Sequence, residues 1–368
     1  MNRKLKVGIL FGGKSAEHEI SLLSAKNVFE AIDRDKYEPV LIGIDKSGRW
    51  LLNEGSNFII NPNDPRLIRL NPSSEPIALV PQSEGAISNL SNGNIDRAVD
   101  VVFPILHGPF GEDGTIQGLL KLADIPFVGA GVLASAVSMD KDVMKRLLRD
   151  AGLPIGEFWT VRPGDKIPDY EEICAKLGSP FFIKPANMGS SVGISKIHNK
   201  ENYLPALDNA FEYDSKILIE EFIPGRELEC SVLGNEGAKG TRIEVSAIGE
   251  IKPKHEFYSY DAKYIDEDGA ELIIPASLPV QIIDRTQELS RQVYKALCCE
   301  GLARVDFFLK EDNSILVNEI NTMPGFTRIS MYPKLWEASG LSYTRLIDRL
   351  IELALMRFEK EKKLKTSV

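Results

Sequence analysis

The sequence lacks three features, and each absence excludes a class of protein. It has no apolar run of the roughly 18 to 20 residues that a membrane-spanning helix needs. Its four cysteines show no CxxC spacing, and Cys298 and Cys299 are adjacent, which argues against a disulfide framework or a zinc knuckle. Basic residues number 44 against 53 acidic ones, giving a net charge of -9, so no broad cationic surface for nucleic acid is expected.

The N-terminus enters an apolar strand without a signal-peptide cleavage pattern, so we expect a cytoplasmic protein with neither a membrane nor a nucleic-acid partner. A chain of 368 residues is too long for one hydrophobic core, which predicts two or three domains. With 43% hydrophobic and 26% charged residues, the composition is that of a globular protein.

The first third of the chain alternates between strand and helix patterns. KVGILFGG reads as a strand, SLLSAKNVFEAIDR as an amphipathic helix and YEPVLIGID as the next strand. With the buried strands VDVVFPILHG and IPFVG, this predicts a parallel sheet over about 130 residues. Between Asn53 and Arg97 the chain is rich in Asn, Pro, Ser and Gly, which predicts a peripheral insertion or a long surface connection.

Further along, strand and helix signals change to a mixed α+β pattern. A helix is predicted from Lys141 to Asp150, ended by Gly152 and Pro154. KILIEEFIPGRELECSVL predicts two adjacent antiparallel strands, and ARVDFFL and ILVNEI predict two more. The irregular segment KHEFYSYDAKYIDEDG is either an active-site lid or an ordinary exposed loop.

Two nucleotide-binding motifs occur in the wrong context. GILFGGKS, residues 8–15, fits the phosphate-loop pattern, but its interior is the predicted strand itself, where a true loop follows its strand. GAGVLA, residues 129–134, fits the dinucleotide fingerprint, but no second strand ending in a carboxylate follows about twenty residues later. Neither a phosphate-loop NTPase nor a nicotinamide dehydrogenase is therefore favoured.

Asp306, Glu319 and Asn321 form the most informative polar group. Asp306 lies on one predicted strand, and strand alternation puts Glu319 and Asn321 on one face of the next. Carboxylate and amide oxygens suit Mg²⁺, which keeps waters and binds substrate phosphates. The alternative is a salt-bridged sheet surface, but acidic groups among apolar strand residues are costly without a cation.

Phosphate and nucleoside ligands are indicated by two further stretches. Lys184 ends an apolar strand before a Gly/Ser turn, whose backbone N–H groups can bind phosphate oxygens. A second strand delivers Glu220 and Glu221 to an exposed connection, and Glu227 follows. Such an edge can bind adenine and ribose, but taken alone these residues are interpreted as solvated charges.

The order of these motifs resembles the ATP-grasp superfamily and, more closely, the D-alanine:D-alanine ligases. The resemblance covers nearly the whole chain and rests on long uninterrupted motifs: FGGKSAEHEISLLSA, HGPFGEDGTIQG, SMDKDVMK, KPANMGSSVG, FYSYDAKY, ARVDFF and NEINTMPGFTRISMYPK. It implies an α/β and α+β fold: a doubly wound N-terminal substrate-binding domain (1–137), a central ATP-grasp domain (138–240) and a C-terminal ATP-grasp domain (241–368) with a lid at 252–270. It also implies a homodimer.

In that family ATP is held between the two ATP-grasp domains. The resemblance implies that Lys141 and Lys184 bind the phosphates, that Glu220 and the backbone around Phe222 meet adenine, and that Glu227 meets ribose. Asp306, Glu319 and Asn321 would hold two Mg²⁺ ions, for which Mn²⁺ could substitute. Three further residues are expected at the nucleotide: Ser191, Glu221 and Asn318.

The family reaction joins two D-alanine molecules through an acyl phosphate. The resemblance implies that Arg304 stabilises this intermediate and that the Gly325 N–H binds the developing oxyanion. Glu17 would pair with the ammonium of the first D-alanine, with His107 nearby, either against the substrate or only against backbone.

The second substrate is expected to meet Lys263, Tyr264, Ser330 and Met331, with Tyr264 directed toward the Glu17 and Ser190 pair. The intact FYSYDAKY favours D-alanine over D-lactate as second substrate, and a depsipeptide ligase is the alternative. Two other hypotheses remain: an ATP-grasp ligase with a different carboxylate and amine, and a nucleotide-binding regulatory protein without turnover.

Overall fold

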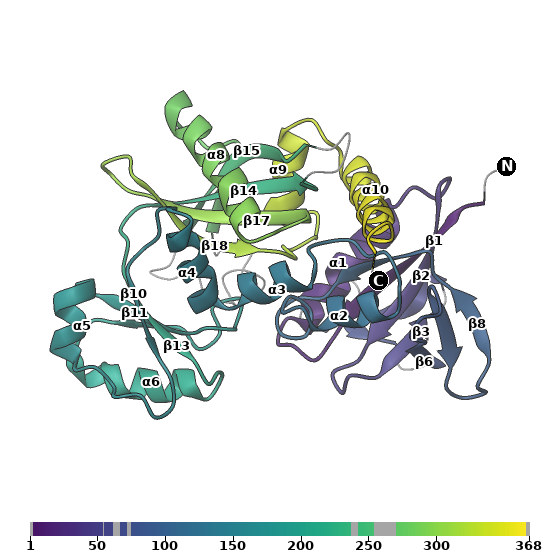
Figure 1. Cartoon of the computed structure of the whole chain (residues 1–368), viewed down its shortest axis with the longest axis horizontal. Helices are drawn as coiled ribbons and strands as arrows, with labels where there is room; N and C mark the ends of the chain where they lie inside the picture. Colours follow the sequence, from purple (N-terminus) through teal and green to yellow (C-terminus); the bar gives the residue numbers. More distant parts are fainter. Residues whose placement is uncertain are drawn as a thin grey trace.

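Three large β-sheets organise the chain, as the computed structural model shows (Figure 1). The structure describes residues 3–53, 55–61, 67–71, 75–236, 242–253 and 270–365. A seven-stranded sheet belongs to the N-terminal third, a four-stranded sheet follows it, and a five-stranded sheet lies toward the C-terminus. The seven-stranded and four-stranded sheets lie at opposite ends of the view, and the five-stranded sheet lies above the space between them.

The seven-stranded sheet has the order β8-β7-β6-β3-β2-β1-β9. Its parallel centre consists of β2 (Tyr37–Ile44), β1 (Leu5–Gly12) and β9 (Val101–Ile105), as the sequence predicted. All five residues of β9 are buried, because helices cover the sheet: α1 (His18–Ala31) and α10 (Tyr343–Glu361) pack against β9, and α2 (Thr115–Leu122) adds its apolar side chains. Helix α3 (Val132–Met139) packs beside α2. The carboxyl end of β1 leads directly into the turn before α1, where Glu17 lies.

The prediction of a wholly parallel sheet was wrong outside this centre. β3 (Trp50–Asn53), β6 (Glu75–Leu79), β7 (Ala86–Asn89) and β8 (Ile95–Ala98) extend the sheet as antiparallel strands. Short turns join β6 to β7 and β7 to β8, and a short turn can connect only antiparallel neighbours. The region between Asn53 and Arg97 is thus an edge of the sheet, with a small ribbon of β4 (Ile59–Ile60) and β5 (Arg69–Leu70) beside it.

The four-stranded sheet has the order β10-β13-β11-β12 and a hydrophobic core of its own. Its strands are β10 (Phe158–Val161), β13 (Ile217–Glu221), β11 (Phe181–Pro185) and β12 (Ser195–Ile197). Helices α5 (Tyr170–Leu177) and α6 (Tyr203–Phe211) bury their apolar faces on it. The turn between β11 and β12 carries the Gly/Ser sequence expected to bind phosphate.

The five-stranded sheet has the order β16-β15-β14-β17-β18. Its strands are β16 (Ala270–Ile273), β15 (Glu244–Pro253), β14 (Arg226–Gly234), β17 (Gly301–Leu309) and β18 (Ile315–Asn321). The helices around it are α4 (Lys141–Asp150), α8 (Val280–Ala296), α9 (Met331–Ala338) and α10 (Tyr343–Glu361). The helix predicted over Lys141–Asp150 is thereby confirmed, with the Asp140 carboxylate accepting from the Val143 N–H as its N-cap.

The prediction that the two strands of KILIEEFIPGRELECSVL are neighbours was wrong. β13 pairs with β10 and β11, whereas β14 pairs with β15 and β17, so the two strands belong to different sheets. The connection over 222–225 contains Pro224 and Gly225, and it carries the chain between the sheets instead of turning it back. The change of sheet thus precedes the predicted boundary at residue 240, which lies outside the described residues. The predicted domain boundaries remain predictions.

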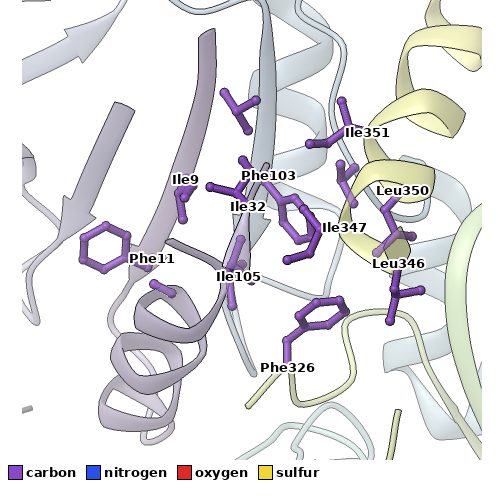
Figure 2. Packing of buried hydrophobic residues seen from close by; sticks show 14 of the residues in the cluster. Ile9, Phe11, Ile32, Phe103, Ile105, Phe326, Leu346, Ile347, Leu350 and Ile351 are labelled. Carbon is purple, nitrogen blue, oxygen red and sulfur yellow. The ribbon is translucent and has the colours of Figure 1, made fainter. Parts of the chain in front are cut away.

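One hydrophobic cluster connects the N-terminal sheet to the C-terminal part of the chain (Figure 2). Side chains of β1 and β9 pack against α10 and the turn that follows β18. Phe103 and Phe326 meet edge to face with ring centroids 5.7 Å apart. The α10 side chains in this cluster are wholly buried, and each such Leu or Ile contributes roughly 1.5 to 3 kcal/mol. The cluster therefore fixes the turn after β18 to the N-terminal sheet.

None of the described helices combines the length and the apolar character that crossing a bilayer requires.

Candidate active site

A cavity of about 690 Å³ lies where the three sheets meet. Its walls come from the turn after β1, the Gly/Ser turn of the four-stranded sheet, and β14, β17 and β18. Most of the predicted site residues line it: Glu17, His107, Lys141, Ser190, Glu227, Arg304, Asp306, Asn318, Glu319, Asn321, Gly325, Ser330 and Met331. Segments more than 300 residues apart in sequence thus converge on one space.

Asp306 and Arg304 form the charged centre of the cavity. Arg304 Nε and Nη2 donate to the two carboxylate oxygens of Asp306 at 2.7 Å each, and Nε also lies 2.8 Å from Glu229 Oε2. Burial opposes the charged guanidinium, but Asp306 and Glu229 more than offset it and hold the pKa of Arg304 well above its usual value. Arg304 therefore remains a cation at the wall of the cavity.

The carboxylates and amide predicted as metal ligands lie side by side on β17 and β18. Asp306 is paired with Glu319 across the two strands, and Arg304 is paired with Asn321. Asn321 Nδ2 donates to Asp306 Oδ2 at 3.3 Å. Among the described residues no three His, Cys, Asp or Glu side chains gather as a metal site. Two carboxylates and an amide still suit Mg²⁺, which takes its other ligands from water and phosphate.

Lys141 connects this acidic group to the four-stranded sheet. Its Nζ donates to the Met188 carbonyl at 2.7 Å and lies 3.7 Å from Glu319 Oε2. The Lys141 side chain is 10% exposed, and it reaches the cavity from the first turn of α4. An ammonium beside Glu319 and the Gly/Ser turn is well placed to bind an anion in the cavity.

The Gly/Ser turn closes onto Glu17. Ser190 Oγ donates a hydrogen bond to Glu17 Oε1, and Ser190 and Ser191 both have left-handed backbone, with φ of 47° and 63°. A Cβ on Gly189 would lie 3.2 Å from Glu17 Oε2, so the backbone approaches this carboxylate closely. The predicted pair of Glu17 and Ser190 is in direct contact in the structure.

His107 is buried between α1 and the turn after β18. Its Nδ1 lies 3.1 Å from the Met323 carbonyl and its Nε2 lies 3.3 Å from Ser24 Oγ. Burial lowers the pKa of His107, and Glu17 and the Met323 carbonyl oppose this only in part. The imidazole therefore lines the cavity and also contacts backbone, and its contact with a substrate stays a prediction.

Glu112 is a cavity residue that sequence reasoning missed. It follows His107 in the motif HGPFGEDG, and its carboxylate accepts the Gly108 N–H at 2.7 Å. Burial and then the neighbouring Glu17 raise the pKa of Glu112 well above its usual value. The available signal was an acid inside a glycine-rich turn, which is a weak signal because such turns are commonly exposed.

The turn after β18 supports Gly325. The Thr327 N–H donates to Ser330 Oγ at 3.1 Å, and the two hydroxyls are 2.7 Å apart. A Cβ on Gly325 would lie 2.9 Å from Ser330 Oγ, so a side chain there would displace Ser330. Gly325 lines the cavity, so its backbone, which carries no side chain, can be approached closely by a ligand oxygen.

The residues predicted to meet adenine lie on β13 of the four-stranded sheet or directly after it, and they do not line the cavity. Phe222 packs against Phe182 with ring centroids 6.1 Å apart, and Lys196 lies 4.3 Å from the Phe222 ring centroid. Glu221 Oε1 accepts the Glu157 N–H at 2.8 Å. Within the described part of the chain, the cavity wall does not include five of the predicted nucleotide residues: Lys184, Ser191, Glu220, Glu221 and Phe222.

Lys184 instead contacts the buried carboxylate of Glu220. Lys145, a residue not predicted from the sequence, lies on the other side of this carboxylate, with its Nζ 3.0 Å from Glu220 Oε1. Lys263 and Tyr264, with the rest of 254–269, lie outside the described residues, so the predicted lid and its tyrosine remain predictions.

Comparison with known proteins gives consistent matches along the whole chain. Residues 6–130 match the family model described as D-ala D-ala ligase N-terminus, and residues 147–352 match D-ala D-ala ligase C-terminus. The chain is 56% identical to a D-alanine--D-alanine ligase of Shouchella clausii, covering 99% of this chain and 98% of that protein. It is 53% identical to D-alanine--D-alanine ligase A of Escherichia coli, covering 99% and 100%.

Solved structures show the same similarity in three dimensions. A D-alanine-D-alanine ligase from Coxiella burnetii superimposes with a TM-score of 0.84 at 37% identity, covering 98% of this chain and 97% of that chain. The VanG D-Ala:D-Ser ligase of Enterococcus faecalis gives 0.82 at 37% identity, covering 96% and 100%. A Bacillus anthracis D-alanine--D-alanine ligase complexed with ATP gives 0.73 at 27% identity, covering 97% and 99%.

Proposed function

Because this chain belongs to the D-alanine–D-alanine ligase family, we propose that it joins two D-alanine molecules into a dipeptide with the conversion of ATP to ADP and phosphate. The observation that carries the proposal is the cavity itself. Arg304, Lys141 and the carboxylates of Asp306 and Glu319 face the same space as Glu17 and Gly325. A phosphoryl group and an amino acid can therefore be held together there.

The reaction begins when the carboxylate of the first D-alanine attacks the γ-phosphorus of ATP, and the bond to the β-phosphate oxygen breaks. Phosphoryl transfer of this kind needs positioning and charge neutralisation more than covalent help from the protein. Lys141 and Lys184 bind the phosphates, and Glu17 binds the ammonium of the first D-alanine. Arg304 neutralises the charge that builds up between carboxylate and phosphate.

The amine of the second D-alanine then attacks the carbonyl carbon of the acyl phosphate. The oxyanion that develops is bound by the Gly325 N–H and by Arg304, and collapse of the intermediate expels phosphate. Ser330 and Met331 position the second substrate beside this turn. Contributions of Lys263 and Tyr264 belong to the same proposal, and the support for them is the sequence motif alone.

The donor set on β17 and β18 supports a proposal of bound Mg²⁺, with Mn²⁺ as a substitute. Asp306, Glu319 and Asn321 would hold two ions between them. When bound, these ions neutralise the charge of the β- and γ-phosphates.

Two copies of the chain are proposed to associate through the N-terminal domain. Apolar side chains are exposed on the two adjacent helices α2 and α3, with Leu122 71% and Leu133 62% exposed. Replacement of both by Lys is expected to convert a dimer into a monomer in light scattering. A molar mass that stays at the dimer value would exclude this surface. The predicted cytoplasmic location remains a prediction.

The experiment that tests the function is phosphate release from ATP and Mg²⁺ with D-alanine, L-alanine, D-alanine plus D-lactate, or D-alanine plus D-serine, with products identified by mass. Dipeptide from D-alanine alone is the expected result. Depsipeptide as the main product would favour the D-lactate alternative, which the relatives do not favour. Absence of phosphate release with every substrate would overturn the proposal and revive the regulatory hypothesis.

A further inference from the structure

A buried cluster of three charged side chains lies outside the cavity wall, on the side of the four-stranded sheet. Lys145 on α4 and Lys184 on β11 both contact the carboxylate of Glu220 on β13, one at each oxygen. Their side chains are 3%, 11% and 9% exposed, respectively. Two ammonium groups thus share one carboxylate in a region from which water is largely excluded.

These three side chains carry two positive charges and one negative charge, and such a buried group is costly unless a further anion joins it, because each charge has lost most of its hydration. Burial accordingly lowers the pKa of Lys145, and the carboxylates of Glu220 and Glu319 oppose this only in part. Lys184 precedes the Gly/Ser turn, so its ammonium is the one that can turn toward an anion there. Lys145 makes a cation–π contact with the Phe158 ring, whose centroid lies 5.8 Å from its Nζ. The cluster therefore contains one lysine that can leave Glu220 and one that stays.

We propose that Lys145 is a positioning residue, which holds and neutralises Glu220 while Lys184 moves from Glu220 to the phosphates of ATP. This inference rests on the nucleotide site of the proposed function and assigns a role to a residue that the motif reading did not use. Glu220 remains ionised in the cluster: burial raises its pKa, but Lys145 and Lys184 together bring it below its usual value.

The proposal predicts different effects on ligands with and without phosphates. Without Lys145, the transfer of Lys184 to ATP would leave Glu220 as a buried carboxylate with no counter-ion, so ATP would bind weakly. Adenosine has no phosphate to draw Lys184 away, so Glu220 would keep Lys184 as its partner. Adenosine affinity should then change little.

The experiment measures dissociation constants of ATP and adenosine by competition with a fluorescent ATP analogue, at fixed Mg²⁺. K145M is expected to weaken ATP binding by about 10- to 100-fold, and adenosine binding by less than about threefold. K145R keeps the cation and is expected to recover most of the ATP affinity. R149M is the matched control, because Arg149 is exposed on the same helix and lies 5.7 Å from the same Phe158 ring without an ion pair to Glu220.

Two outcomes would overturn the proposal: unchanged ATP affinity in K145M, or equal weakening of ATP and adenosine, which would mean that Lys145 only supports the fold. A second comparison, of E220Q with K145M/E220Q, tests whether Lys145 instead contacts phosphate directly. If Lys145 acts through Glu220, the double variant binds ATP as tightly as E220Q, and a further loss overturns the proposal.

If K145M alone fails to fold, the comparison of E220Q with K145M/E220Q still tests the proposal. The double variant removes the charges of Lys145 and Glu220 together, so neither is left buried without the other. Failure of this inference is distinguishable from failure of the proposed function. An enzyme that makes dipeptide while K145M binds ATP normally overturns only the role of Lys145, whereas a parent protein that makes no dipeptide overturns the function.

Discussion

Ser190 donates a hydrogen bond to Glu17 and so joins two segments that are 173 residues apart in sequence. One residue belongs to the Gly/Ser turn of the four-stranded sheet and the other to the turn between β1 and α1. This contact spans the cavity from its nucleotide side to its amino-acid side. Its strength should therefore affect how the two substrates are brought together.

Replacing Ser190 by Ala tests this contact. A hydrogen bond to a charged group is worth about 1.5 to 3 kcal/mol, so we expect KM for D-alanine to rise by at least about tenfold. KM for ATP should rise by less than about threefold, since Glu17 does not belong to the phosphate site. Initial rates at varied D-alanine and varied ATP give both constants. An equal rise in KM for D-alanine and KM for ATP would contradict this and show that the contact shapes the whole cavity. S47A, in an exposed turn, is the control.

Replacing Glu319 by Gln should raise the Mg²⁺ concentration needed for half-maximal activity by about tenfold or more, because one negatively charged ligand is lost. A titration of activity with Mg²⁺ after treatment with a chelator measures this. E311Q is the matched control, because Glu311 lies exposed in the turn between the same two strands. Identical Mg²⁺ curves for E319Q and the parent would remove Glu319 from the metal site.

His107 should make the fold sensitive to mild acid. Burial holds its pKa in the folded protein below the usual value near 6.5, so the unfolded chain binds more protons as the pH falls through about 6.5. The contribution of His107 to the free energy of unfolding should therefore decrease between pH 7.5 and 5.5, whereas Glu112, whose pKa is raised by burial, acts in the opposite direction. Urea unfolding at the two pH values measures this, and H107Q should show a smaller decrease than the parent. H198Q, altered at an exposed histidine, should keep the full decrease; an unchanged decrease in H107Q would contradict the assignment.

Asp348 should contribute to stability without contributing to catalysis. It is buried on α10 and accepts from Tyr37 Oη at 2.5 Å and from Lys36 Nζ at 2.6 Å. Tyr37 is the first residue of β2, and Lys36 directly precedes it. D348N is expected to lower the free energy of unfolding by about 1 to 3 kcal/mol, because it weakens two hydrogen bonds to a buried charge. Urea unfolding and kcat are the measurements, with D35N at an exposed neighbouring turn as control. A large loss of kcat at unchanged stability would be the contrary result.

Local patterns predicted the elements well and their assembly less well. The helix over Lys141–Asp150 follows from its own N-cap and periodicity, and the pairing of Asp306 with Glu319 follows from two strands joined by a short turn. The placement of β13 and β14 in different sheets does not follow, because Pro224 and Gly225 permit either a turn or a crossing. Strand membership there is decided by contacts with residues far away in the sequence.

The candidate site shows the same division. The family resemblance implied roles for Glu17, Ser190 and Arg304, but it assigned none to Lys145 or Glu112, although both lie within the motifs SMDKDVMK and HGPFGEDGTIQG. The two missed residues have their roles only through partners from other elements: Glu220 for Lys145, and the Gly108 N–H and Glu17 for Glu112. A buried counter-charge has no sequence pattern of its own, because any helix can present a lysine to the interior.

The shared packing of Phe103, Phe326 and α10 has a mechanical consequence. The seven-stranded and five-stranded sheets are joined by one continuous core and should behave as a single block, whereas the four-stranded sheet keeps a separate core. We expect ATP binding to rotate the smaller unit against that block, which small-angle X-ray scattering would detect as a fall in the radius of gyration. An unchanged radius would exclude the rotation. In such a rotation Lys184 would move with the smaller unit, while Gly325 would keep its place in the larger block. A small molecule bound where the two units connect would therefore inhibit the enzyme without resembling either substrate.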